Sequence, residues 1–208
     1  MTNKIAAMSF LLIITTNLHC QQMGFTIGIT TSIFNNSAPF TKMGMGLDAN
    51  LFNEKALPLN HCFIKTGIGY TQIRGNGTIN YYNQINEVVL SYNKMQVLNY
   101  AQVPLLFKYN FSKSAKHKLG ILGGVQYGLL FAGWHNPQTV NINHNVTKQF
   151  VRNILGGQLG LEYTKPLSGN LLLHIISSYR TSLTTIQKGS NASYGEFVIG
   201  IGLGIDKK

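Results

Sequence analysis

Charge and cysteine are both scarce in this chain, and each shortage restricts the class of protein. Only 11% of its 208 residues are charged, whereas about 25% is usual in soluble domains. The two cysteines are Cys20 and Cys62. Removal of an N-terminal leader would leave Cys62 alone, which excludes an internal disulfide framework. No run of about 20 apolar residues follows the N-terminal segment, so the sequence predicts no membrane-spanning helix.

Acidic residues are the scarcer of the two charged kinds. The chain has 17 Lys and Arg but only 6 Asp and Glu, which gives a formal net charge of +11. Such an excess can indicate nucleic-acid binding. Here the basic residues are scattered singly, without an Arg-rich helix or a basic stripe of the kind that marks nucleic-acid interfaces. We therefore expect no nucleic-acid partner.

The N-terminus resembles a secretory signal. Lys4 precedes an apolar run from Ile5 to Ile14, and small and polar residues follow. This order predicts a signal peptide over 1–20, with the folded domain at 21–208. A second interpretation is a lipoprotein acylated at Cys20, although a small residue normally precedes such a cysteine and His19 stands there instead.

Alternation with a period of two is the main signal in the rest of the chain. In the stretch KLGILGGVQYGLLFAGW, from Lys118 to Trp134, large apolar residues occupy the odd positions and small or polar ones most of the even positions. This period predicts a β-strand. The same alternation recurs in eight segments, at 23–34, 40–52, 62–73, 97–111, 118–134, 150–163, 171–182 and 194–206. Each is long enough for the 9–11 residues of a tilted strand that crosses a bilayer.

The connections between these segments alternate between long and short. Long polar connections occur at about 75–96, 134–148 and 183–193, and short ones such as SKSAKH and KPLSGN lie between them. Extracellular loops and periplasmic turns of an outer-membrane barrel alternate in this way. We expect the three long connections to lie on one rim of the barrel and the short turns on the other.

The two faces of each strand indicate which side meets lipid. Glycine on a wetted strand face weakens the strand and gives no solubility, whereas inside a small barrel it relieves crowding. The sequence therefore predicts an all-β fold, an eight-stranded antiparallel up-and-down transmembrane β-barrel, with its large apolar side chains turned toward lipid. The same alternation turns a polar network into the lumen, made of Lys42, Asp48, Lys65, Gln102, Lys108, Gln126, Arg152, Gln158, Glu162, His174 and Arg180.

Aromatic residues stand near the ends of several predicted strands. Tyr109, Phe111 and Tyr163 lie near the short turns, and Trp134 lies at the opposite end of its strand. Aromatic side chains are enriched at the two membrane–water interfaces. We expect these four residues to form an aromatic girdle.

Two adjacent segments carry a family resemblance. NYAQVPLLFKYNF, followed by a short turn and KLGILGGVQYGLLFAG, is similar to the "porin family", or PorT-like, outer-membrane β-barrel domain, and so are GGQLGLEY and EFVIGIGLGI. The similarity spans about 23–206, and 97–111 with 118–133 is its most specific part. It implies a Gram-negative outer-membrane protein with periplasmic termini. Many such barrels end on an aromatic residue, whereas this chain ends GIDKK, with Phe197 as its last aromatic.

Catalytic and metal-binding interpretations compete with this one. His174, Ser178 and Glu162 invite comparison with a nucleophile, base and carboxylate, as in barrels that act on lipid A. We favour a structural network in the lumen, because a lipid chain would have to enter a filled barrel. The loop residues His135 and His144 lack further Cys or acidic ligands nearby. We expect no catalytic site, no metal and no cofactor.

The sequence thus predicts a non-enzymatic outer-membrane anchor. Its expected partners are outer-membrane lipids and a protein or surface ligand that binds the connections at 75–96, 134–148 and 183–193. An open pore is not expected, because a barrel of eight strands is filled by side chains. Two alternatives remain: an accessory component of protein secretion, and a lipid A-modifying enzyme.

Overall fold

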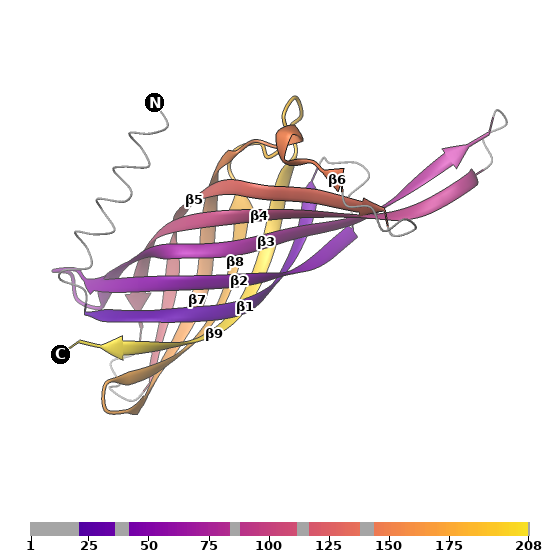
Figure 1. Cartoon of the computed structure of the whole chain (residues 1–208). Helices are drawn as coiled ribbons and strands as arrows, with labels where there is room; N and C mark the ends of the chain where they lie inside the picture. Colours follow the sequence, from indigo (N-terminus) through magenta and orange to yellow (C-terminus); the bar gives the residue numbers. More distant parts are fainter. Residues whose placement is uncertain (1–20, 36–41, 84–87, 112–116, 138–143, 208) are drawn as a thin grey trace.

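The computed structural model describes residues 21–35, 42–83, 88–111, 117–137 and 144–207. The predicted signal peptide at 1–20, including Cys20, lies outside the described residues. Within these ranges, all regular structure is β apart from one 3-10 turn, η1 (Thr147–Gln149) (Figure 1). The strands are β1 (Gln22–Asn35), β2 (Lys42–Ala56), β3 (Cys62–Tyr82), β4 (Val88–Asn110), β5 (Lys118–Pro137), β6 (His144–Asn145), β7 (Asn153–Ser168), β8 (Leu171–Ser182) and β9 (Ser193–Asp206).

The strands form a closed antiparallel barrel. Their order around the wall is β4-β3-β2-β1-β9-β8-β7-β5, and an additional β4–β5 pairing closes the ring. The two-residue β6 pairs only with the end of β5, so the wall has eight strands, as predicted. Closure gives every wall strand two neighbours, so the backbone N–H and C=O groups form hydrogen bonds within the barrel, which hydrocarbon chains cannot provide.

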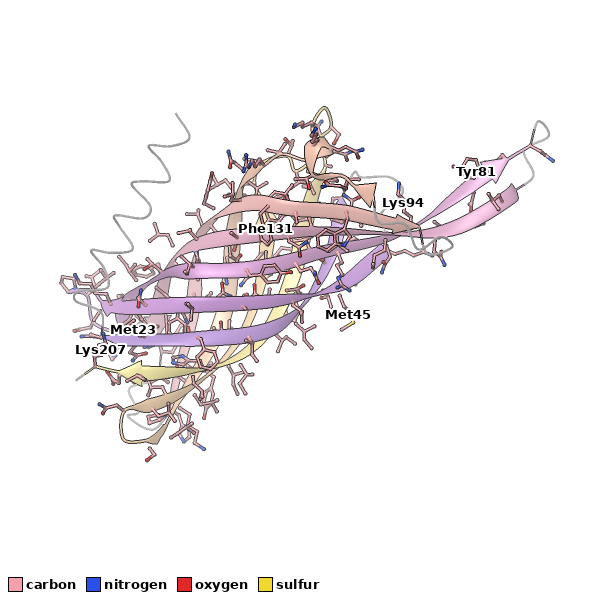
Figure 2. The ribbon with its side chains drawn as sticks, in the orientation of Figure 1. Met23, Met45, Tyr81, Lys94, Phe131 and Lys207 are labelled. Carbon is pink, nitrogen blue, oxygen red and sulfur yellow. The ribbon has the colours of Figure 1, made fainter. Side chains whose placement is uncertain are left out.

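The two faces of the wall differ as the alternation predicts. Ile27 is 56% exposed and Leu159 61% exposed on the outer surface, whereas Gln126 is 4% exposed and Glu162 is fully buried. Figure 2 shows Met23, Met45 and Phe131 on the outside of the ribbon. The prediction that large apolar side chains face outward is therefore confirmed. No helix in the described part of the chain is long and apolar enough to span a membrane.

One seam of the wall is irregular. The β2–β3 register shifts between Met43 and Asp48, which leaves part of the β3 backbone without a strand partner there. Hydroxyl groups of β1 supply the missing bonds. Thr30 Oγ1 donates to the Gln72 carbonyl at 3.1 Å, and Ser32 Oγ contacts both the Arg74 amide and its carbonyl at 2.8 Å. Glycine between them allows this approach, since a Cβ at Gly46 would overlap the Gln72 carbonyl oxygen.

The predicted loop at 75–96 is mostly strand, and this is the main correction to the expected fold. β3 continues to Tyr82 and β4 begins at Val88, and they pair in register as far as Tyr81↔Leu90, with a shift before Tyr82↔Val88. Since β2 pairs with β3 only up to Asn76, the two strands project beyond the rest of the wall (Figure 1). We call the paired residues 77–82 and 88–94 the arm. Met23 and Lys207 lie at the opposite end of the barrel (Figure 2).

Candidate functional site

The lumen near the chain ends is packed with ion pairs. Glu162 accepts hydrogen bonds from Lys65 Nζ at 2.9 and 3.0 Å and lies 3.4 Å from Lys108 Nζ. Lys108 also binds Glu54 at 3.0 Å, and His174 Nδ1 contacts Glu162 at 2.6 Å. We call these five residues the lysine–glutamate network. All five are buried, and its two lysines balance its two carboxylates.

An aromatic ring lies against this network. The Lys65 ammonium lies 3.9 Å from the centroid of the Phe52 ring, and the same ring packs edge-on against His174 at 5.0 Å. A desolvated cation over an aromatic face is stabilised by the quadrupole of the ring. Phe52 thus helps to hold Lys65 and His174 in one arrangement.

A second cluster lies further from the chain ends. The Arg180 guanidinium donates two hydrogen bonds to the Asp48 carboxylate and lies 3.7 Å from Glu196. Thr71 donates to Glu196 at 2.7 Å, and Gln102 donates to Asp48 at 3.1 Å. We call these residues the arginine cluster. Because their strands lie far apart around the wall, the cluster ties opposite sides of the barrel together.

The structure places nine of the eleven predicted lumen residues in the buried interior. The two others differ from the prediction. Lys42 lies beyond the last β1–β2 pair, Ser32↔Gly44, where it is exposed and binds Thr78 at 3.3 Å. Arg152 is exposed just before β7, where the adjacent chain turns aside to pair Phe150 with Gln187. The nine buried residues are Asp48, Lys65, Gln102, Lys108, Gln126, Gln158, Glu162, His174 and Arg180.

Sequence reasoning missed two buried carboxylates. Glu54 falls beyond the predicted end of its strand at residue 52, although β2 runs to Ala56. Glu196 lies in a predicted strand, at an even position like the inward-facing Val198 and Gly200. The same alternation therefore contained the signal for Glu196, whereas Glu54 required the correct strand end.

The lumen at the arm end is filled by apolar side chains from the wall and from the connections. Phe150 bridges to Gln187, and the Val151 amide donates to the Ile186 carbonyl at 2.8 Å, which joins the connections at 146–152 and 183–192. We call the apolar set the mouth cluster. Its buried members are Phe34, Ile73, Leu98, Tyr100, Leu130, Val146, Phe150, Ile154, Ile186, Ala192 and Tyr194.

The two fillings leave little free space. An interior cavity lined by Asp48, Gln102 and Arg180 among others measures about 40 Å³, room for only a few water molecules. On both sides of this cavity, side chains of the described residues fill the interior.

The geometry does not assemble a hydrolytic triad. Glu162 binds His174, but the Ser178 hydroxyl accepts a hydrogen bond from Gln158 at 3.2 Å, and His174 Nε2 has no hydrogen-bond partner. A serine nucleophile needs the free imidazole nitrogen as its base. Within the described ranges, no group of three or more His, Cys, Asp or Glu could hold a metal ion.

The four predicted girdle residues lie near the two ends of the wall. Tyr109 and Phe111 are exposed and pack edge to face at 5.5 Å. Tyr163 is half-buried, stacks on His117 and contacts its Nδ1 at 2.6 Å. Trp134 is half-buried at the other end, where it pairs with Asn145. Their contact with the membrane interfaces stays a prediction.

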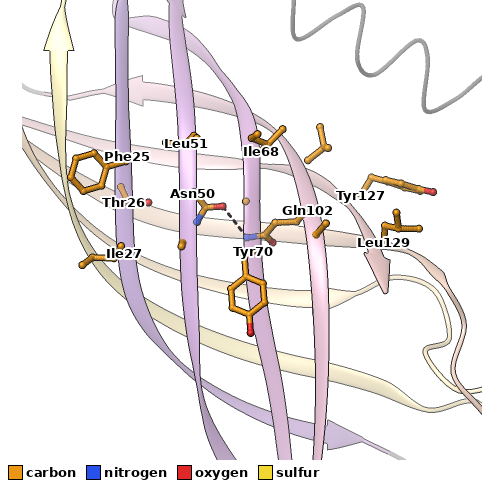
Figure 3. A pocket seen from close by; sticks show the side chains of 14 residues that line it. Phe25, Thr26, Ile27, Asn50, Leu51, Ile68, Tyr70, Gln102, Tyr127 and Leu129 are labelled. Carbon is orange, nitrogen blue, oxygen red and sulfur yellow. Dashed lines mark hydrogen bonds between the residues drawn. The ribbon is translucent and has the colours of Figure 1, made fainter. Parts of the chain in front are cut away.

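One of the broad hollows of the outer wall extends across β1, β2, β3, β4 and β5. It measures about 720 Å³, and its lining includes the small Ala49 and Ala101 together with larger side chains such as Leu51 and Ile68 (Figure 3). The Tyr70 hydroxyl in this region donates to Asn99 at 2.5 Å. Because this hollow is on the outer face, acyl chains of the membrane would fill it.

The arm differs from the wall in both composition and exposure. Cross-strand hydrogen bonds join Thr78 to Asn93 at 3.2 Å and Ser91 to Asn80 at 2.8 Å on one face. Apolar side chains at other positions are exposed, including Tyr82 at 59% and Leu90 at 57%. The arm therefore presents aromatic and aliphatic groups outside the barrel.

Comparisons with known proteins found several solved structures and one family model to which the chain is similar. No curated protein matches the chain. Among solved structures, it resembles Neisserial surface protein A with 10% identity and a TM-score of 0.48, over 89% of this chain and 97% of that one. The Ail protein of Yersinia pestis, in complex with the heparin analogue sucrose octasulfate, has 14% identity and a TM-score of 0.43 over 88% and 98%. OprG of Pseudomonas aeruginosa has 13% identity and a TM-score of 0.43 over 91% and 98%.

A family model describes nearly the whole chain. The model for the outer membrane protein beta-barrel domain matches residues 19–206, a range that contains all eight wall strands. The eight-stranded wall, the apolar outer face and the polar lumen are the features expected of such a domain. The chain therefore belongs to the outer membrane protein beta-barrel domain family and is a protein of the bacterial outer membrane.

Proposed function

We propose that this protein is a non-enzymatic, non-conducting anchor in the outer membrane that presents its arm and neighbouring connections to a partner. The filling of the lumen is the observation that carries this proposal. The lysine–glutamate network, the arginine cluster and the mouth cluster occupy the interior from end to end. Among the described residues, side chains fill the lumen and the Ser178 hydroxyl binds Gln158 rather than His174, so we infer that the protein acts through surfaces outside the barrel.

The proposal places both termini in the periplasm and the arm outside the cell. Gln22 pairs with Asp206, so both ends of the barrel domain lie at one end of the wall. The β7–β8 turn at that end spans only residues 169–170, as in the short periplasmic turns of outer-membrane barrels. A protease added to intact cells should cut within the arm and spare a tag placed after Lys208. If the protease instead removed the C-terminal tag, the protein would have the opposite orientation to the one proposed.

Replacement of the arm tests the anchoring role. A variant in which an Asn-Gly turn joins Asn76 to Lys94 should still shift its gel mobility on boiling, as folded barrels do, but should lose capture of the surface partner by intact cells. Leu59→Asp, in an exposed connection at the opposite end, is the matched control and should keep capture. Equal capture by the arm variant would contradict the proposal.

Conduction and catalysis give separate tests. The purified barrel in planar bilayers should show no stable pore, because side chains fill its interior. The mass of lipid A from cells should be unchanged by His174→Ala. A steady conductance would contradict the claim that the barrel is non-conducting, and a shift in lipid A mass would contradict the claim that it is non-enzymatic.

An accessory role in secretion is the second candidate. The similarity of 97–111 and 118–133 to PorT-like domains supports it, and so does an exposed arm that a passing polypeptide could meet. Deletion of the gene should then trap exported cargo in the periplasm, and restoration of the full chain, but not of the arm variant, should release it. Normal secretion in the deletion strain would exclude this role.

A further inference from the structure

Arg74 lies on the outer face of the wall. Along β3, Thr71 and Ile73 point into the barrel, where Thr71 binds a lumen carboxylate and Ile73 belongs to the mouth cluster. Because β3 pairs with β4 without a shift over this stretch, alternation places Arg74 on the opposite face, together with Tyr70. Arg74 is half-buried, and its Nε–H group has no hydrogen-bond partner among the described residues. The wall thus carries an outward cation with unused hydrogen-bonding capacity.

The described carboxylates do not neutralise this cation. They belong to Asp48, Glu54, Glu162 and Glu196, which are buried in the lumen, and to Asp206, at the opposite end of the barrel. Ionisable side chains on the lipid face of a barrel are rare, and they are costly unless they reach the interface or meet a counter-ion. Arg74 therefore favours an anion from outside the barrel, at the membrane surface.

Three polar side chains continue this outward face from Arg74 toward the middle of the wall. Gln72 Nε2 donates to Asn99 Oδ1 at 3.1 Å and to the Tyr70 hydroxyl at 3.3 Å, and that hydroxyl donates to Asn99 at 2.5 Å. Gln72 Oε1 is buried and has no hydrogen-bond partner among the described residues. We call these three residues the outer polar group. They interrupt an outer surface that is otherwise mostly apolar.

The apolar hollows of the outer wall begin where the outer polar group ends. Tyr70 lines two of them, which measure about 720 and 630 Å³ and also share Ile27 and Ala49. The larger one reaches Ala101, the β4 partner of Tyr70 (Figure 3). A wide apolar surface, a hydrogen-bonding group and a cation therefore follow one another along the wall. The acyl chains, the linkage region and the anionic headgroup of a lipid have the same order.

We propose that Arg74, the outer polar group and the adjoining hollows bind one membrane lipid with an anionic, phosphate-bearing headgroup. The phosphate lies at the Arg74 guanidinium, whose planar fork matches phosphate oxygens. The linkage region lies against Tyr70, and the acyl chains fill the hollows. This inference goes beyond the proposed anchoring role, and it does not depend on which end of the barrel faces the cell exterior.

Trp134 lies at the same level of the wall as Arg74. The register Arg74↔Val97↔Trp134 crosses three neighbouring strands, which separates the two backbones by about 10 Å at the usual strand spacing. Gly133 packs against Leu98 of the mouth cluster, so alternation turns the next residue, Trp134, outward. Tryptophan is enriched where headgroups begin. Its indole is therefore a built-in reporter of a lipid bound at Arg74.

Fluorescence quenching tests the headgroup preference. Trp134 is the single tryptophan of the chain. With the full chain folded in phosphatidylcholine vesicles, phosphatidylglycerol with brominated chains should quench it at about tenfold lower mole fraction than phosphatidylcholine with the same chains. One charge-assisted hydrogen bond has an effect of this size. Arg74→Gln should abolish the preference, and Lys165→Gln, at an exposed lysine of the opposite end, should keep it. Equal quenching by the two lipids, or an unchanged preference in Arg74→Gln, would overturn the proposal.

Native mass spectrometry from detergent tests the hollow. The parent chain should retain one phosphatidylglycerol and no phosphatidylcholine, and Ala101→Phe should retain neither because the new ring occupies the hollow. Leu161→Phe is the matched control, since Leu161 is also exposed on the outer wall but does not line the two hollows, and it should keep the lipid. Equal retention of both lipids would mean that lipid coats the wall without a site. A dimer that Ala101→Phe separates would mean that a second copy covers the hollow, and either result would overturn the proposal.

Discussion

Near the chain ends the lumen is filled by lysines and glutamates, whereas near the arm it is filled by leucine, isoleucine and aromatic rings. In the first region Glu162 alone contacts Lys65, Lys108 and His174. In the second, Leu98 and Leu130 pack among residues from the wall and from two connections. Both regions exclude water, but they depend on different forces.

The difference lies in how each region responds to loss of one member. A buried ion pair gives little net stability when complete, because desolvation offsets the attraction, yet it costs heavily when one partner is removed. A buried apolar side chain contributes in proportion to its area, and its removal costs that area plus a cavity. We therefore expect the charged region to be the more sensitive to single changes and the more tolerant of paired ones.

The largest effect is expected from Glu162→Gln. The change leaves Lys65 with no carboxylate in a buried site, so the free energy of unfolding should fall by about 3–5 kcal/mol. Urea unfolding from lipid vesicles, followed by fluorescence of the single tryptophan, Trp134, measures it. Asp206→Asn at the end of β9 is the control and should change stability by less than about 0.5 kcal/mol. A loss below about 1 kcal/mol for Glu162→Gln would mean that the network is solvated.

A smaller loss is expected from Leu98→Ala in the mouth cluster. Leu98 is fully buried, so the substitution should cost about 2–4 kcal/mol through lost contacts and the cavity left behind. Leu161→Ala is the matched control, because Leu161 is 50% exposed on the outer wall and lipid can fill the space. Equal losses for the two variants would show that the mouth cluster is not tightly packed.

The barrel itself was predictable from sequence because the side chains on the outer face of its wall must be apolar to lie in lipid. That requirement imposes a strict alternation, and it defined the strands at 118–134 and 171–182 correctly. Where the constraint ends, prediction failed. The arm at 77–82 and 88–94 extends beyond the wall, so the alternation between lipid and lumen is not imposed on it. Its strands carry polar and apolar residues in a weaker pattern and were expected to be a loop.

The site was predictable only in part, for a related reason. Alternation predicts the side of the wall on which Lys65 and Glu162 lie. Their ion pair also depends on how the strands are shifted relative to one another around the barrel, and the sequence of a single strand does not contain this information. The inward prediction for Arg152 was wrong because this residue lies at the very end of the wall. Its carbonyl still accepts from the Leu130 amide, but its side chain is exposed where the preceding chain turns to pair Phe150 with Gln187. The mouth cluster went unrecognised because Val146 and Ile186 belong to connections whose inward folding has no periodic signature.

The irregular β2–β3 seam lies at the level of the mouth cluster, where Ile73 pairs with Leu98, and should show an intermediate effect. Ser32→Ala removes the hydroxyl that bonds both the amide and the carbonyl of Arg74. Stranded backbone groups cost about 1–3 kcal/mol, so stability should fall by that amount in the same urea experiment. Thr31→Ala, at the adjacent outward position, is the control. If both variants match the parent chain, water or another group satisfies the β3 backbone at the seam.

The smallest effect is expected from a paired replacement in the charged region. Lys65→Met with Glu162→Leu removes one charge of each sign and leaves the Glu54–Lys108 pair intact at 3.0 Å. His174 keeps a contact with Thr164 at 3.3 Å, so the double variant should lie within about 1 kcal/mol of the parent. Each single change should cost several times more stability, and comparison of the four proteins in a double-mutant cycle measures the coupling between the two residues.

A double variant as unstable as Glu162→Gln would mean that the attraction between the charges outweighs their desolvation in this lumen. If the double variant is as stable as the parent, the network contributes to strand register rather than to stability. Heterogeneous gel mobility of the double variant alone would show this role.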